Sequence, residues 1–246
     1  MDKLPSYKHI FNLSFPIMLG SAAQNLIALT DSLFLYHFSE VDFAAIGLVS
    51  VFYLTVNAIG FGFSKGGQIM IARRFGEQRF QWLGKTFRML IFFELLLATL
   101  MFLFLWYGTP WLFSIIIQST EVYDRCLEYL VHRSWGGFFA YAGLCMMALY
   151  MGISRSRFII VNTIVLAVVN IFLDYVLIFG YWGFPEWGIK GAGLASSSAE
   201  GVAVVLFILY AAFDKKLQPM KLWKWGKIQW GLLKTMLRTS FPIVIQ

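Results

Sequence analysis

Apolar residues occur in long runs along the chain, and short polar segments separate these runs. A helix needs roughly 20 predominantly apolar residues to cross a bilayer core of about 30 Å. The pattern therefore predicts six membrane-spanning helices, over residues 10–38, 43–72, 87–107, 127–150, 159–179 and 189–213. A seventh span is expected to begin near Thr239. The expected fold class is an all-α polytopic membrane protein.

The composition agrees with this expectation. Hydrophobic residues make up 59% of the 246 residues and charged residues only 13%, whereas a soluble domain averages about 25% charged residues. The two cysteines, Cys126 and Cys145, are too few for a disulfide framework. The N-terminus has no small-residue cleavage site behind a short apolar core, so the first run is expected to be a retained span rather than a signal peptide.

The net charge of +7 could indicate nucleic-acid binding, but the placement of the basic residues does not. Sixteen of the twenty lie in the N-terminal tail or in the links after the second, fourth and sixth spans: Lys3, Lys8, Arg73, Arg74, Arg79, Lys85, Arg88, Arg155, Arg157, Lys215, Lys216, Lys221, Lys224, Lys227, Lys234 and Arg238. Basic loops mark the cytoplasmic side of a membrane protein. The N-terminus is therefore expected in the cytoplasm, Arg125, Arg133 and Lys190 are expected on the opposite side, and no nucleic-acid partner is expected.

The link over residues 214–238 combines lysines with Trp223, Trp225 and Trp230. Basic residues interleaved with tryptophan favour a helix that lies on the membrane surface. A simple basic loop is the alternative.

A short internal repeat suggests how the chain is organised. The segment 8–17 and the segment 234–243 both begin with lysine and end in Ser-Phe-Pro-Ile. Six spans separate the two copies, so both would enter the membrane from the same side, as in a parallel repeat. The repeat predicts a six-helix lobe over 1–213, an inter-lobe linker over 214–238, and the truncated start of a second lobe over 239–246.

Five charged residues fall within the predicted spans: Asp31, Lys65, Glu94, Asp174 and Glu200. A charge at the centre of a bilayer costs about 2.5–3.5 kcal/mol on insertion scales, so each is a candidate for function. Glu94 lies near the end of its span, and its side chain is expected to reach the membrane surface and serve a structural role.

Asp31 shares a helix face with Gln24 and Ala28, because these residues are spaced by four and three positions. Asn170 lies one turn before Asp174, so both would present oxygen atoms to the same point. Oxygen ligands suit a hard cation such as sodium, and a buried carboxyl group can instead carry a proton. A packing contact between helices is the alternative.

The sixth span contains Ser196, Ser197, Ser198 and Glu200 among small residues that permit close helix approach. Glu200 is expected either to join the polar site or to pair with Lys65. Pro16 in the first span removes a helix hydrogen bond and could form a hinge. His9, His37 and His132 are isolated, and no H-E-x-x-H, P-loop or G-x-S-x-G motif is present, so no enzymatic activity, catalytic residue or organic cofactor is expected.

Four segments in order resemble the multidrug and toxic compound extrusion (MATE) family. They are residues 15–20 with 29–34, residues 60–62 with 71–76, residues 170–180 and residues 188–195. The resemblance covers essentially the whole chain. Lys65 and Glu200 are departures from the family pattern.

The resemblance implies twelve spans in two six-helix lobes around a central cavity, with this chain as the N-terminal lobe and the C-terminal lobe missing. It also implies export of cationic or amphipathic organic compounds across the bacterial inner membrane, driven by entry of H⁺ or Na⁺. Pro16 and Asp31 fall on the family's positions in helix 1, and Asn170 and Asp174 on those in helix 5. Ser196 takes the place of a helix 6 hydroxyl. A coupling ion, either H⁺ or Na⁺, would bind at Asp31, Asn170 and Asp174, while Pro16, Gln24 and Glu200 would form the substrate cavity or hinge.

Two other functions are compatible with the same architecture. A flippase for lipid-linked oligosaccharides would need a more cationic cavity, and the intramembrane balance of one lysine against four acids argues against it. A non-transporting membrane scaffold would tolerate neutral replacement of the buried acids.

Overall fold

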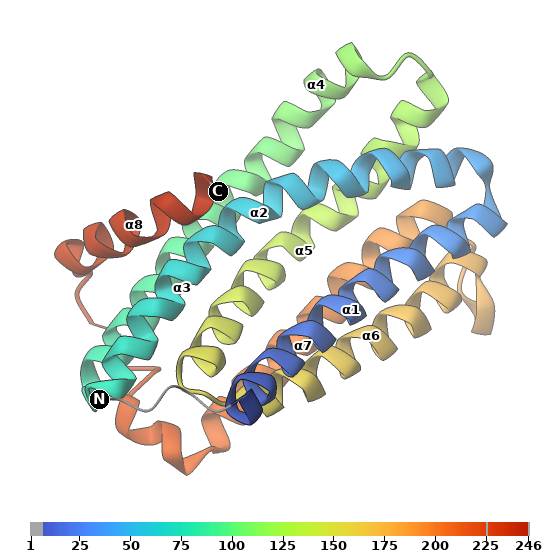
Figure 1. Ribbon diagram of the computed structural model, residues 1–246. Coiled ribbons are helices and arrows are strands. Elements are labelled where there is room, and N and C mark those ends of the chain that lie inside the picture. The colour runs from blue at the N-terminus through green and yellow to red at the C-terminus, as the bar shows by residue number, and fades with distance from the viewer. Residues whose placement is uncertain (1–6, 225, 246) are drawn as a thin grey trace.

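The computed structural model describes residues 7–224 and 226–245, without the side chains at several positions before residue 25 and at 244 and 245. Most of the described residues are helical, and none of them lies in a strand. The α-helices are α1 (Tyr7–Phe38), α2 (Glu40–Gly76), α3 (Phe80–Leu103), α4 (Thr109–Ile116), α5 (Thr120–Gly152), α6 (Ser156–Phe179), α7 (Gly188–Phe213) and α8 (Trp230–Ile245) (Figure 1). The predicted all-α class is confirmed.

The long helices run side by side over the length of the molecule (Figure 1). Among the described residues, α2, α5, α6, α7 and the rod from Phe80 to Ile116 are long and apolar enough to cross a membrane. α1, with 32 residues, lies along them. Five of the six predicted spans therefore correspond to helices of membrane-spanning length and apolarity, and α1 occupies the range of the first.

The third span is longer than the predicted range 87–107. α3 continues through a π-helical turn, η1 (Phe104–Gly108), directly into α4. Pro110 in the first turn of α4 explains the π turn, because proline has no N–H to donate and its ring crowds the preceding turn.

Short polar segments end the helices. The side chain of Ser39 accepts a hydrogen bond from the Asp42 N–H at the start of α2, and Ser119 caps α5 in the same way through Val122. Gly180 ends α6 with a φ of 71°, a left-handed conformation that glycine adopts without strain. The 3₁₀ turn η2 (Tyr181–Gly183) then leads towards α7.

The helices form two sub-bundles. One contains α1, α6 and α7, the other α2, α3 and α5, and the contact between α5 and α7 joins them (Figure 1). Small residues allow this contact: a Cβ atom on Gly136 of α5 would lie 3.0 Å from the Ser197 Cα, and one on Gly193 of α7 would lie 3.0 Å from the Tyr129 carbonyl oxygen.

A buried carboxylate also joins the sub-bundles at one end of the molecule. Asp42 of α2 is 1% exposed. Its Oδ2 accepts a hydrogen bond of 3.0 Å from the Ile189 N–H at the start of α7, and its Oδ1 lies 3.3 Å from the Arg125 Nε of α5. Three helices are therefore fixed to one another at this point.

The segment after α7 contains a short 3₁₀ helix, η3 (Lys215–Met220), and irregular backbone over 221–224 and 226–229. A continuous surface helix is not formed in the described part of this segment, and Trp225 lies outside the described residues. α8 begins at Trp230, so Thr239 lies inside this helix rather than at its start.

α8 packs along α2 (Figure 1). Its buried Ser240 donates a hydrogen bond of 3.2 Å to the Phe63 carbonyl oxygen. A Cβ atom on Gly66 of α2 would lie 2.9 Å from the Ser240 Cα, so the two helices approach closely at this glycine.

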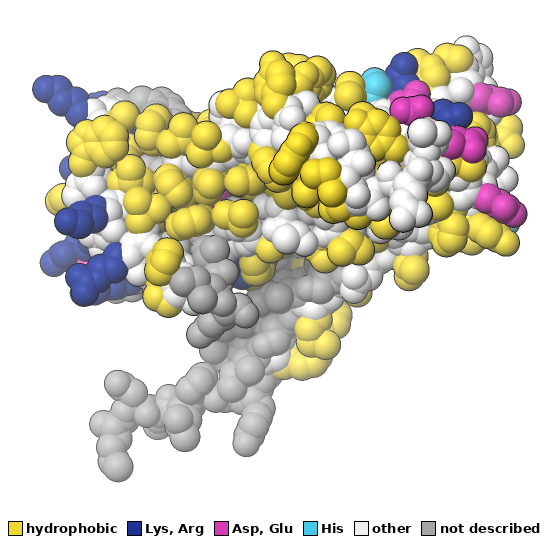
Figure 2. All heavy atoms as spheres, turned by 90° about the horizontal axis from the view of Figure 1, so that it is seen from above, with side chains coloured by type: hydrophobic (Ala, Val, Ile, Leu, Met, Phe, Trp, Pro, Cys, Tyr) yellow, Lys and Arg dark blue, Asp and Glu magenta, His cyan; other side chains and the backbone are white. Residues whose placement is uncertain are grey.

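Charged side chains gather at the two ends of the molecule. Figure 2 shows Lys and Arg side chains at one end, and most of the visible Asp and Glu side chains at the other. We call the first the basic end; it comprises the turn after α2, the turn after α5 and the segment between α7 and α8. Glu77 is part of it, and a hydrogen bond from Arg73 holds the pKa of Glu77 below its ordinary value.

Candidate functional site

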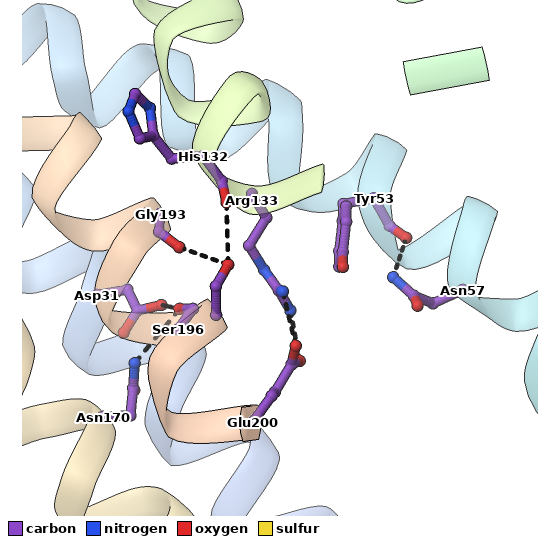
Figure 3. Close-up of polar contacts among 10 residues, drawn as sticks. Asp31, Tyr53, Asn57, His132, Arg133, Asn170, Gly193, Ser196 and Glu200 are labelled. Atoms are coloured by element: carbon purple, nitrogen blue, oxygen red, sulfur yellow. Dashed lines mark hydrogen bonds and ion pairs between the residues drawn. The ribbon is translucent and has the colours of Figure 1, made fainter. Parts of the chain in front are cut away.

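Asp31 of α1, Asn170 and Asp174 of α6, and Ser196 of α7 meet inside the first sub-bundle. All four are buried. The Asn170 Nδ2 donates to the Ser196 Oγ at 3.3 Å, and the Ser196 Oγ lies 3.5 Å from the Asp31 Oδ2 (Figure 3). Asp174 lies one helical turn beyond Asn170 on the same face of α6 and is fully buried. The four residues predicted as an ion-coupling site are thus brought together.

The packing of α6 against α7 explains this geometry. A Cβ atom on Gly191 of α7 would lie 2.6 Å from the Leu177 carbonyl oxygen of α6, so only glycine permits the observed approach. Asn170 and Asp174 are one turn apart and point from α6 towards the same place. The glycine of α7 therefore places Ser196 within reach of Asn170.

The site has more acceptors than donors. In the described residues, Asp31 Oδ1, Asn170 Oδ1 and both carboxylate oxygens of Asp174 are buried without a hydrogen-bond partner. A buried acceptor without a donor is costly, and a buried charge without a partner costs far more. A cation or a proton at this position would satisfy these oxygens.

The polar atoms that meet here are almost all oxygens. Two carboxylates, one amide oxygen and one hydroxyl are hard oxygen ligands of the type that bind hard cations, and protonation of a carboxyl group would serve the same oxygens. Among the described residues, no group of three or more His, Cys, Asp or Glu side chains could hold a metal ion.

A second polar cluster lies one helical turn along α7. Arg133 of α5 makes two parallel hydrogen bonds with Glu200 of α7, of 2.7 Å from Nη1 and 2.5 Å from Nη2 (Figure 3). The guanidinium group lies 4.3 Å from the centre of the Tyr53 ring on α2. The Arg133 side chain is 8% exposed and that of Glu200 is 20% exposed. This ion pair connects the two sub-bundles next to the ion site.

The structure corrects two predictions about charged side chains. Glu200 pairs with Arg133 and not with Lys65, whose Nζ donates to the Gln68 Oε1 at 3.2 Å. Glu94 does not reach the membrane surface: it is fully buried, because α3 extends well beyond the predicted span, and both of its carboxylate oxygens lack a hydrogen-bond partner in the described residues.

Arg133 is the residue that sequence reasoning missed. We expected it among the loop residues opposite the basic end, whereas it is buried within α5. The sequence did indicate that Arg133 is buried in the membrane, because position 133 falls inside the predicted span 127–150. Pro16 and Gln24 lie in α1, but their side chains are outside the described part of the structure, so their predicted roles stay predictions.

Comparisons with known proteins place the site in a family. The MatE family model matches residues 16–176. A probable multidrug resistance protein NorM from Rhizobium meliloti is 29% identical over 234 residues, which are 95% of this chain and 50% of that protein. A NorM protein from Thermotoga maritima is 28% identical and covers 97% of this chain and 51% of its own length.

Solved structures show the same fold. An outward-facing MATE transporter of the MOP superfamily superposes with a TM-score of 0.84 at 22% identity and covers 96% of this chain and 51% of its own. The eukaryotic MATE transporter AtDTX14 also reaches 0.84, at 14% identity, and covers 95% of this chain and 51% of its own. The chain thus spans about half the length of the relatives that it matches.

The match to the family model includes Asp31, Asn170 and Asp174 and extends over most of the six-helix arrangement. Together with the helical fold and the buried acids, it shows that this chain belongs to the MatE family and corresponds to the N-terminal half of its relatives.

Proposed function

We propose that the protein containing this chain is a secondary active antiporter that exports cationic or amphipathic organic compounds in exchange for H⁺ or Na⁺. The observation that carries this proposal is the group of buried acceptors on Asp31, Asn170 and Asp174 that lack donors in the described residues. The names of the NorM relatives, which are described as probable multidrug resistance proteins, support the substrate class.

The coupling ion acts by changing the electrostatics between α1 and α6. With one ion bound, one of the two negative charges of Asp31 and Asp174 is compensated, and the two helices stay together. After the ion leaves, two carboxylates in a medium of low dielectric constant repel each other, and this favours a different arrangement of α1. Two conformations with different ion affinities are the requirement for coupled transport.

The other parts of the proposed transporter are those that the resemblance to the MATE family implies. The helices α1 to α7 form one lobe, the segment over 214–229 connects it to a second six-helix lobe that begins with α8, and the organic substrate crosses between the two lobes by alternating access. The basic end faces the cytoplasm of a bacterium, because basic loops are retained on that side of the inner membrane.

The test uses the full-length protein in proteoliposomes loaded with a cationic fluorescent dye. Sodium and proton gradients are imposed separately. Dye movement with one gradient, and its loss in Asp31→Asn and in Asp174→Asn, is expected. Asp124→Asn is the matched control, because Asp124 is an exposed acid on α5 for which the described residues provide no ion pair.

No dye movement with either gradient would refute an antiporter of organic cations. Binding of a lipid-linked oligosaccharide in place of dyes would then indicate the flippase. Unchanged transport in both aspartate variants would instead refute the assigned ion site while leaving the substrate class intact.

A further inference from the structure

A small cavity opens at the basic end, between α3 and the segment that precedes α8. Its volume is about 150 Å³, a size that holds a benzene-sized molecule in other proteins. The lining residues are Lys85, Arg88 and Met89 of α3, with Gly226, Lys227 and Gln229 of the segment. Three positively charged side chains therefore converge on one cavity, far from the ion site inside the membrane.

The walls of the cavity are fixed to one another. The Arg88 Nη1 donates a hydrogen bond of 2.5 Å to the Lys221 carbonyl oxygen, and the Gln229 N–H lies 3.4 Å from the Met89 Sδ. The Phe87 ring packs edge-on against Trp223 with the ring centres 6.5 Å apart. These contacts hold the segment against α3 on both sides of the cavity, so the cavity is part of the fold.

No carboxylate compensates the charge of this cavity in the described part of the chain. The two described acids of the basic end are engaged elsewhere: Glu77 pairs with Arg73, Arg74 and Arg79, and Asp214 pairs with Arg155. Lys85, Arg88 and Lys227 thus have no acidic partner among the described residues. Positive charges that converge without a counter-charge attract an anion.

Exposed tryptophans show where the cavity lies relative to the membrane. Trp82, Trp223 and Trp230 are all exposed. Trp82 lies beside Lys85, whose Nζ is 4.3 Å from the centre of the tryptophan ring. Tryptophan rings gather at the level of the lipid headgroups. The cavity therefore lies at the depth at which the membrane itself presents phosphate groups.

We propose that this cavity binds the phosphate headgroup of an anionic phospholipid such as phosphatidylglycerol. Basic pockets at the cytoplasmic ends of membrane helices are suited to such headgroups, and the guanidinium group of Arg88 and the two ammonium groups supply charged donors to phosphate oxygens. The acyl chains of the lipid would extend along the apolar surface of α3 below Trp82. The site is independent of ion coupling and of the exported substrate.

The test is a lipid titration of the full-length protein in detergent, followed by native mass spectrometry. Phosphatidylglycerol is expected to bind more tightly than phosphatidylcholine. The double variant Lys85→Gln/Lys227→Gln is expected to lower that affinity about 25-fold, since each lysine near an anionic lipid contributes roughly fivefold. Arg88 is kept, because its contact with the Lys221 carbonyl oxygen also holds the segment in place.

The matched control is Lys215→Gln/Lys216→Gln, which removes the same charge from the same end but outside the cavity. An equal loss of affinity in both double variants would overturn the proposal in favour of diffuse attraction, as would equal binding of the two lipids. Displacement of the lipid by millimolar inorganic phosphate would reassign the cavity to free phosphate. If the first variant does not fold, Lys227→Gln alone, on the exposed segment, keeps the test decisive, with about a fivefold loss expected.

Discussion

Arg133 and Glu200 form an ion pair whose two charges depend on each other, because the arginine side chain is almost completely buried. We predict that Glu200→Gln lowers the free energy of unfolding by about 3 kcal/mol, since removal of one partner leaves a buried charge uncompensated. The measurement is denaturant or thermal unfolding in detergent. The double variant Arg133→Gln/Glu200→Gln is expected to recover most of the loss. If the double variant is as unstable as the single one, the charge of Arg133 is not the cause.

The acceptors around Asp174 lead to a different prediction about stability. Ligand binding to the folded state alone stabilises it, by about 2.7 kcal/mol at a concentration 100 times the Kd. The parent protein is therefore expected to unfold at a higher temperature in the presence of its coupling ion, as a sodium titration or a shift to lower pH would show. Asp174→Asn should abolish this increase, whereas Asp124→Asn should retain it. An increase that survives in Asp174→Asn would exclude this carboxylate as a ligand.

At the scale of the elements, the contact between α2 and α8 depends on a single glycine. A Cβ atom at position 66 would lie too close to the Ser240 backbone, while one at position 47 of the same helix meets nothing within 4 Å. We predict that Gly66→Leu separates α8 from α2 and speeds hydrogen exchange over residues 230–243. Gly47→Leu is the matched control. Equal exchange in both variants would show that the close approach does not hold α8 in place.

The helices could be predicted because each depends on a local pattern. Runs of apolar residues located the long helices α1, α2, α3, α5, α6 and α7, and the spacing of Asn170 and Asp174 placed both on one face of a helix. The extension of α3 to Ile116 escaped prediction because it passes through a π turn next to Pro110. The start of α8 at Trp230 escaped it because the lysines and tryptophans of that segment are typical of a helix on the membrane surface.

The contacts between helices could not be derived from local patterns. Chemistry marked Asp31 and Asp174 as separate candidates, since a buried acid requires compensation, and only the family resemblance joined them in one hypothesis. The partner of Glu200 could not be chosen in the same way, since Lys65 and Arg133 offer the same charge and only the packing of α5 against α7 decides between them. Local patterns contain no information about which helices become neighbours.

At the scale of the whole molecule, the distribution of charge predicts its orientation. Most Lys and Arg residues lie at the basic end, and most exposed acids at the opposite end (Figure 2). We predict that a cysteine at Lys216 reacts with a membrane-impermeant thiol reagent only after the cells are opened, whereas one at Glu121 reacts in intact cells. A variant in which buried Cys126 and Cys145 are replaced by alanine provides the background. The reverse pattern would place the basic end outside.

Asp42 has a mechanical consequence for the two sub-bundles. It links α2 to both α5 and α7 at the end opposite the basic end, through one backbone N–H and one arginine. A rotation of the sub-bundles about an axis through this point would leave both bonds intact, and the displacement would grow with distance from Asp42. The ion pair of Arg133 and Glu200, which also joins the sub-bundles, would have to adjust to such a rotation. Asp42 thus restricts the directions in which the two halves of the lobe can move.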